Sequence, residues 1–200
     1  MSQRRRYHPR IAALVVLVAV VVAGTDCAAA WKAEPDVDIP SYAVTEVAST
    51  NLNIDSVVLM CEPARDVNVL QFQIYLSGEG PFRPNGVPAE RLKADPRAEI
   101  TVDSRVFPVS ILFADEYVVL ADSQRGRFPL LSDRLLDALQ EGKRMVVRFD
   151  LAEHPDGAAT FDGEAVIELE SPAIAAVRRC ASPPAVPRAA NAGGVAFAKY

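Results

Sequence analysis

Apolar and polar residues alternate along much of the chain between residues 42 and 170, as in β-strands that turn one face toward a core. The clearest example is VLQFQIYL at residues 69–76, where every second residue from Leu70 to Leu76 is apolar and two glutamines and a tyrosine stand between them. Further strands are expected at residues 52–54, 56–62, 99–103, 106–113, 117–122, 144–151 and 158–170. The pattern predicts a mainly β domain.

Two short segments follow a helical pattern instead. The first is expected to begin after Ser132, whose side chain can cap a helix, and to end at Gly142, with leucines at positions 135, 136 and 139 on one face. The second is expected at residues 172–181, where Ser171 provides a cap and Pro172 takes the first helical position. The domain therefore carries one or two short helices, one of them at its C-terminal end.

Residues 77–98 interrupt the strands with four prolines and three glycines, which predicts an irregular excursion. Such long connections are uncommon in compact domains and are often functional. Its candidate recognition residues are Phe82, Arg83, Arg91 and Lys93, because aromatic and arginine side chains are enriched at binding hot spots. The alternative is a surface loop that only connects two strands.

The N-terminal segment has the layout of a secretory signal peptide. Four arginines precede an apolar run at residues 11–24, and Ala28–Ala30 follows it, so cleavage is expected after Ala30. A helix of that run is about 21 Å long, shorter than the ~30 Å hydrocarbon core of a bilayer. An uncleaved anchor and lipidation at Cys27 are the alternatives. Export to the periplasm or the exterior is the expectation.

The rest of the chain divides into three parts on composition. Residues 31–41 are expected to form a flexible leader, residues 42–181 a single β-rich domain, and residues 182–200 a disordered tail rich in alanine, proline and glycine.

Charge narrows the classes of partner. The net charge of the whole chain is −5, and it falls to −8 without residues 1–30, which carry four arginines and one aspartate. A chain this acidic is not expected to bind nucleic acid or anionic lipid, which require a basic face. No stable membrane insertion is expected after cleavage, and the expected partner is an unknown envelope or secreted protein.

Cys61 and Cys180 remain after removal of the signal peptide, and in an oxidising compartment an even number of cysteines predicts a disulfide. Two buried free thiols are the alternative. A zinc site is not expected, because two cysteines and His154 cannot complete a zinc shell without carboxylates. No cofactor is predicted.

Catalytic signatures are weak throughout the sequence. No HExxH, GxSxG or Walker motif is present, and His154 beside Pro155 is expected to be an exposed turn residue. A group of acidic residues near that turn is interpreted as a solvated face and not as a calcium site: Asp150, Glu153, Asp156, Asp162 and Glu164. No catalytic residue is predicted, although a small hydrolase that uses carboxylates is the alternative function.

Five short segments resemble a loose group of small exported bacterial proteins of unknown function: SVVLMCE, LQFQIYL, LLDALQEGKRMVVRF, FDGEAV and AIAAVRRC. More distantly, they resemble invasion-associated locus B-like proteins and periplasmic proteins associated with type VI secretion. The resemblance covers about residues 55–181. It implies an antiparallel, β-sandwich-like domain with a disulfide, and carries over no catalytic residue. The expected function is an exported, non-enzymatic module that binds a protein or an envelope component.

Overall fold

The computed structural model describes residues 30–78, 80–114, 116–154, 157 and 160–181. Nearly all of the predicted signal peptide and the whole predicted tail, residues 182–200, lie outside these ranges.

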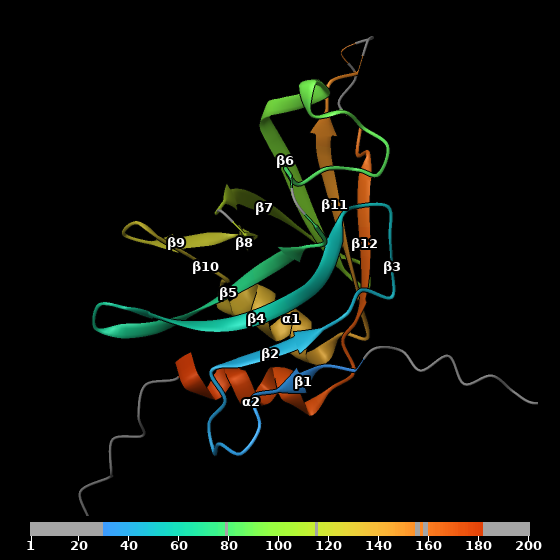
Figure 1. The fold of residues 1–200 in the computed structure, drawn as a ribbon. Coiled ribbons are helices and arrows are strands. Elements are labelled where there is room, and N and C mark those ends of the chain that lie inside the picture. The colour runs from blue at the N-terminus through green and yellow to red at the C-terminus, as the bar shows by residue number, and fades with distance from the viewer. Residues whose placement is uncertain (1–29, 79, 115, 155–156, 158–159, 182–200) are drawn as a thin grey trace, which may run out of the picture.

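One antiparallel sheet dominates the fold (Figure 1). Its ten strands have the order β1-β2-β4-β5-β8-β7-β6-β11-β12-β3. Their bounds are β1 Lys32–Ala33, β2 Tyr42–Thr45, β3 Ser49–Thr50, β4 Ile54–Ala64, β5 Val67–Leu76, β6 Leu92–Val102, β7 Arg105–Phe113, β8 Tyr117–Ala121, β11 Arg144–Ala152 and β12 Gly163–Glu168. Two further strands, β9 (Ser123–Arg125) and β10 (Phe128–Leu130), form a separate hairpin.

The sheet curls because β7 belongs to both of its halves. The first part of β7 pairs with β6, from Arg105 to Val109, and its last part pairs with β8, from Ser110 to Phe113. The two ends of the sheet also meet: the indole Nε1–H of Trp31, next to β1, donates to the carbonyl oxygen of Glu168 in β12 at 2.8 Å. In Figure 1, β4 and β5 run across the view from the left toward β11 and β12, which stand nearly upright on the right. The mainly β, sandwich-like fold with short helices is confirmed.

The core lies between the two halves of the curled sheet. Phe72 of β5 and Phe149 of β11 are both almost completely buried and belong to one apolar cluster that also contains leucines of α1. Both faces of β5 are covered, since Gln71 and Gln73 are 6% and 2% exposed. The alternation of apolar and polar residues along this strand predicts that the face with the glutamines is exposed to solvent, and the structure shows that it is buried.

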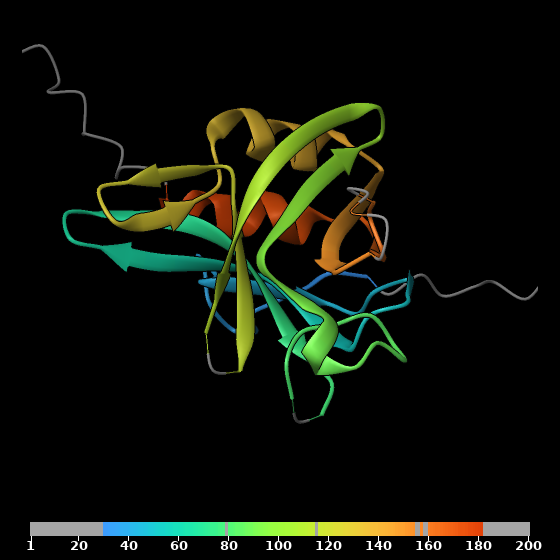
Figure 2. The same cartoon turned by 90° about the horizontal axis from the view of Figure 1, so that it is seen from above.

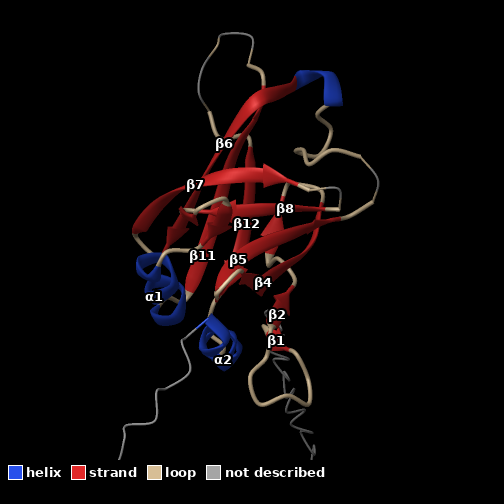
Figure 3. Ribbon diagram, turned by 90° about the vertical axis from the view of Figure 1, so that its left-hand side faces the viewer, coloured by secondary structure: helices blue, strands red, loops and turns tan. Residues whose placement is uncertain are grey.

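Helices α1 (Asp133–Glu141) and α2 (Pro172–Ala181) lie at one end of the sheet, as Figure 3 shows. The Ser132 hydroxyl oxygen accepts from the backbone N–H of Leu135 at 3.2 Å, which confirms the predicted cap. Helix α1 ends at Gly142 in extended backbone, with φ −77°. Glycine is needed there because a Cβ would overlap the side chain of Val102. Among the described residues, no helix is long and apolar enough to cross a membrane.

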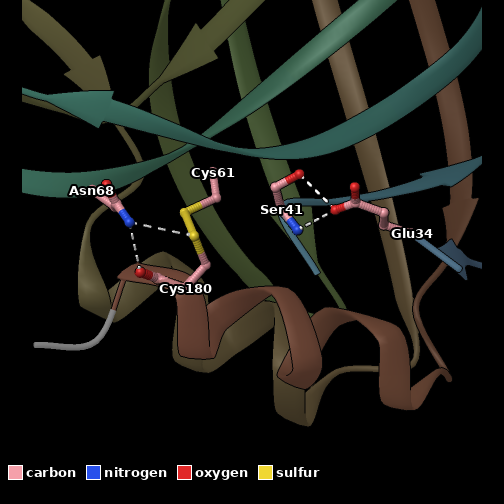
Figure 4. The surroundings of a disulfide bond; sticks show 5 residues. All are labelled: Glu34, Ser41, Cys61, Asn68 and Cys180. Carbon is pink, nitrogen blue, oxygen red and sulfur yellow. Dashed lines mark hydrogen bonds between the residues drawn. A yellow bond between two sulfur atoms is a disulfide. The ribbon is translucent and has the colours of Figure 1, made fainter. Parts of the chain in front are cut away.

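A disulfide joins Cys61 of β4 to Cys180 of α2, with the two Cα atoms 6.3 Å apart. The side-chain amide of Asn68 donates to the carbonyl oxygen of Cys180 at 3.1 Å, next to the disulfide (Figure 4). The predicted pairing is thus found, and it fastens the end of α2 to the β4–β5 hairpin.

The prediction of a flexible leader at residues 31–41 needs correction. Trp31 is 5% exposed and belongs to the core, and β1 pairs with β2. Glu34 closes the turn between these strands, because its Oε2 accepts from the backbone N–H and the hydroxyl of Ser41 at 2.8 and 2.7 Å. The same two hydrogen bonds, the backbone one first, lower the pKa of Glu34. These residues are part of the domain.

The excursion is shorter than predicted. Strand β6 begins at Leu92, so the irregular segment is residues 77–91, and it contains the short 3-10 helix η1 (Ala89–Arg91). In Figure 3 this short helix lies at the opposite end of the sheet from α1 and α2.

Candidate functional site

The predicted recognition loop is packed against the domain. Phe82 is 3% exposed and meets Phe149 edge to face, with ring centroids 4.8 Å apart. The backbone N–H of Arg83 donates to the side-chain oxygen of Asn53 at 2.9 Å. Phe82 is therefore an anchor that holds the loop to the core, and its ring is not available to a partner.

The two other predicted contact residues also face the molecule. The Arg91 guanidinium donates to the carbonyl oxygen of Glu153 at 2.9 Å, and the backbone N–H of Glu153 donates to the Arg91 carbonyl at 2.7 Å. Lys93 forms an ion pair with Asp150. The structure thus does not bring the four predicted residues together on one free surface.

Asp150 is a buried carboxylate held by two cations. Its side chain is 2% exposed and contacts Lys93 through Oδ1 and Arg97 through Oδ2, the latter at 2.6 Å. Burial raises the pKa of Asp150, but the hydrogen bonds and charges of Lys93 and Arg97 outweigh burial and leave that pKa below its ordinary value. The carboxylate is charged and fully engaged, so it is poorly suited to act as a catalytic base.

The turn after β11 is built around Asp162. Its two carboxylate oxygens accept from the backbone N–H groups of Leu151 and Ala152, at 3.0 and 2.6 Å. His154 is half-buried, with Nε2 3.5 Å from Asp162 Oδ2, so the expectation of an exposed turn residue is wrong for its ring.

The same region corrects the interpretation of a solvated acidic face. Ligand atoms of Asp150, His154 and Asp162 lie within 4.8 Å of one another, a donor set that a metal could use. The cations beside Asp150 and the N–H groups on Asp162 already satisfy these carboxylates. Glu164 is exposed and pairs with Arg148 at 3.1 Å, Glu153 is exposed, and Asp156 lies outside the described residues. Asp162 therefore fixes the turn, and Asp150 ties β11 to β6.

A cleft lies between the tips of two hairpins. The β4–β5 hairpin and the β9–β10 hairpin extend side by side from the same edge of the molecule in Figures 1 and 2. The cleft between them has a volume of about 500 Å³ and is lined by Ala64, Arg65, Asp66, Val67, Arg125, Gly126, Arg127 and Phe128. An adjoining cleft of about 350 Å³ shares Arg125 and reaches α1 and α2 through Asp133, Arg178 and Ala181. The linings of the two clefts have Arg125 in common, and the pair is here called the hairpin cleft.

Three arginines of the hairpin cleft have no counter-ion among the residues that the structure describes. Arg65, Arg125 and Arg127 are exposed and form no ion pair or side-chain hydrogen bond with any residue that the structure describes. Phe128 beside them is 37% exposed. On a chain with a net charge of −5, this is a local concentration of free positive charge next to an aromatic ring.

The β9–β10 hairpin is held firmly at its base. The Gln71 side-chain amide donates to the carbonyl oxygen of Pro129 at 2.6 Å, and the backbone N–H of Leu131 donates to the Leu70 carbonyl at 2.8 Å. These contacts fix the base of the β9–β10 hairpin against β5. A rigid frame lowers the entropy that a partner would lose on binding.

The two tips differ in how they make the same tight turn. Each has two residues between paired strand ends, and the first of them has positive φ: 64° for Gly126 and 57° for Arg65. Glycine adopts this conformation freely, whereas an L side chain there costs about 1–2 kcal/mol. A strained residue that carries an unpaired charge is an observation that suggests a function.

Comparisons with protein-family models, with curated proteins and with solved structures find no match. Sequence reasoning missed the hairpin cleft. The available signal was the RGRF stretch at residues 125–128, a glycine between two arginines beside an aromatic residue, after a predicted strand.

Proposed function

We propose that the protein is an exported, non-enzymatic module that binds a protein or envelope component through the hairpin cleft. The observation that carries the proposal is a set of three arginines, around an open cleft beside Phe128, to which the described part of the chain supplies no counter-ion. Arginine and aromatic side chains dominate the binding energy of protein interfaces. The cleft takes the place of residues 77–98 as the candidate recognition surface.

Two further features support this proposal over a carboxylate-dependent hydrolase. The most buried acid, Asp150, is neutralised by Lys93 and Arg97. A cleft at the Asp162 turn is an open one in which the carboxylate of Glu164 is already paired with Arg148. Export is supported by the signal-like N-terminus and by a disulfide, which persists in oxidising compartments.

Site-specific photocrosslinking in the producing cells tests the binding proposal. A photoreactive phenylalanine analogue in place of Phe128, which lines the cleft, should give a crosslinked adduct, and one at position 90, in η1 at the far end of the sheet, should not. The adduct should disappear when Arg125 is also changed to Glu. Equal crosslinking from positions 128 and 90, or an adduct that survives Arg125→Glu, would contradict the proposal.

The location is tested on the same material. N-terminal sequencing of the mature protein from the periplasm or the medium should begin at Trp31 or within a few residues of it. Full-length protein confined to the cytoplasm would overturn the proposed export.

A further inference from the structure

The lining of the hairpin cleft also restricts the chemistry of its ligand. We infer that the cleft binds a short, extended protein segment in which carboxylate side chains alternate with apolar or aromatic ones. This inference rests on the proposed function, and it names the class of partner for the same site.

The positive charges select carboxylates. Arg65 and Arg127 are contributed by opposite hairpin tips, and Arg125 stands where the two clefts join. A guanidinium has donors in a rigid planar fork that matches a carboxylate, so each free arginine can bind one acidic side chain in bidentate fashion. Three such forks along one lining favour a ligand with several acidic groups over a single small anion.

The negative charges in the same lining exclude a dense polyanion. Asp66 stands beside Arg65 at the tip of the β4–β5 hairpin, and Asp133 lies in the adjoining cleft. Neither carboxylate forms a side-chain ion pair with a described residue. A nucleic acid or polyphosphate carries a negative charge at every repeat, so some of its phosphates would be repelled by these aspartates. A peptide can instead place a neutral or basic side chain opposite them.

Apolar groups in the lining complete the match. Val67 and the half-exposed ring of Phe128 line the first cleft, and Val69 and Leu130 line the second. These surfaces offer contacts to aromatic or aliphatic side chains, which a sugar or an inorganic anion lacks. The two volumes of about 500 and 350 Å³ are of the size that ligand sites have, about 300–1,000 Å³.

A substitution of Arg65 can distinguish a role in binding from a purely structural role. Its φ of 57° is one that glycine adopts without strain, so Arg65→Gly relaxes the turn while it removes one guanidinium. The substitution should raise the urea midpoint of unfolding and, at the same time, weaken peptide binding by about threefold or more. A structural role would make stability and binding change in the same direction.

Fluorescence anisotropy with labelled synthetic peptides tests the ligand class on the mature chain. The probes are the peptide Glu-Phe-Asp-Leu-Glu-Phe-Asp, a hepta-glutamate, a version of the first peptide with lysine at every acidic position, and inorganic polyphosphate. The first peptide should bind at least about tenfold more tightly than the others, and its affinity should fall as salt is raised.

Two charge reversals and one matched control locate the site. Arg125→Glu and Arg127→Glu should each weaken binding of the acidic-aromatic peptide by at least about tenfold. Arg144→Glu should leave it unchanged, because Arg144 is also exposed and its side chain forms no ion pair with a described residue, yet it lies outside the cleft lining. Arg125→Gln repeats the test without adding negative charge. Urea midpoints of unfolding equal to that of the wild type show that the variants fold.

The outcomes separate this inference from the proposed function. Equal or tighter binding of polyphosphate would overturn the ligand class, as would binding that Arg144→Glu weakens as much as Arg127→Glu. No peptide binding together with a crosslink from position 128 overturns the inference and leaves the proposed function standing. Loss of both the crosslink and the peptide binding overturns the two together.

Discussion

The carboxylate of Asp122 accepts hydrogen bonds from both the backbone N–H and the hydroxyl of Ser132, at 2.7 and 2.5 Å. The two residues bracket the β9–β10 excursion, so this contact closes its base. Ser132 is also the cap of α1. One side chain thus fixes the hairpin that carries Arg125 and Arg127 and the start of the helix that lines the adjoining cleft.

Replacement of Asp122 by Ala should therefore weaken both elements. Hydrogen bonds to a charged group contribute about 1.5–3 kcal/mol, and we expect a loss of about that size in the free energy of unfolding, measured by urea denaturation. The control is Asp133→Ala, which removes a carboxylate from the first turn of the same helix and should cost about 0.3–1 kcal/mol through the helix dipole. Equal losses in the two variants would argue against the clamp.

The buried Asp150 predicts how stability depends on pH. Because the pKa of Asp150 in the fold lies below its ordinary value of 3.8, its contribution is present above that pH and is lost as pH falls through the folded pKa. Asp150→Asn should cost about 3–5 kcal/mol at pH 7, since it removes the charge of a buried carboxylate and leaves the partly buried Lys93 without its charged partner.

The pH dependence is measured as the free energy of unfolding by urea at pH 7, 5 and 3. Wild-type stability should fall toward pH 3 more steeply than that of Asp150→Asn. Asp55→Asn, at an exposed carboxylate, should follow the wild type. Parallel curves for wild type and Asp150→Asn would mean that this carboxylate does not set the acid sensitivity.

The disulfide is expected to stabilise the domain and to keep the hairpin cleft in shape. It links residues 119 positions apart, and in the chain-entropy model a closed loop of that length contributes about 4–5 kcal/mol. Reductant should lower the urea midpoint and weaken peptide binding, because α2 contributes Arg178 and Ala181 to the cleft lining. A Cys61→Ala/Cys180→Ala double variant should be equally weakened and should no longer respond to reductant. A response that persists in that variant would point to another target.

Phe82 should behave as a core residue. Phe82→Ala should cost about 3–5 kcal/mol, because it removes a buried ring that contacts Phe149. The matched control is Phe161→Ala, since Phe161 is 48% exposed and its loss should stay within about 0.5 kcal/mol. Thermal unfolding of both variants compares them directly. If Phe82→Ala were harmless to stability, residues 77–91 would again be open to partners.

The periodicity of apolar residues predicted the strands and helices that are long enough to show a clear pattern in the sequence. Strand β5, helix α1 with its Ser132 cap and helix α2 at residues 172–181 lie where the pattern placed them. Strands β9 and β10 were missed because each has three residues, too few for any alternation to be visible.

Long-range packing explains the remaining differences. Trp31 and Phe82 stand in stretches rich in proline and acidic or polar residues, which predict loops, and only the closed sheet shows that their rings enter the core. Asp150 belongs to a run of acidic residues near a turn, which suggests a solvated face. Its two cations come from β6, more than fifty positions earlier in the chain. The hairpin cleft likewise joins tips that local sequence cannot place together.

The hydrogen bond between Trp31 and Glu168 determines when the sheet can close during folding. Trp31 is made early, but its acceptor follows 137 residues later, so the curled sheet cannot close until nearly the whole domain has been synthesised. Closing such distant contacts is slow and leaves strand edges unpaired in the meantime. During this interval β3 has no partner, because β12 is made last, and the core-facing residues of β4 and β5 are uncovered. A chaperone that shields them would act on this first third of the chain, before β12 emerges.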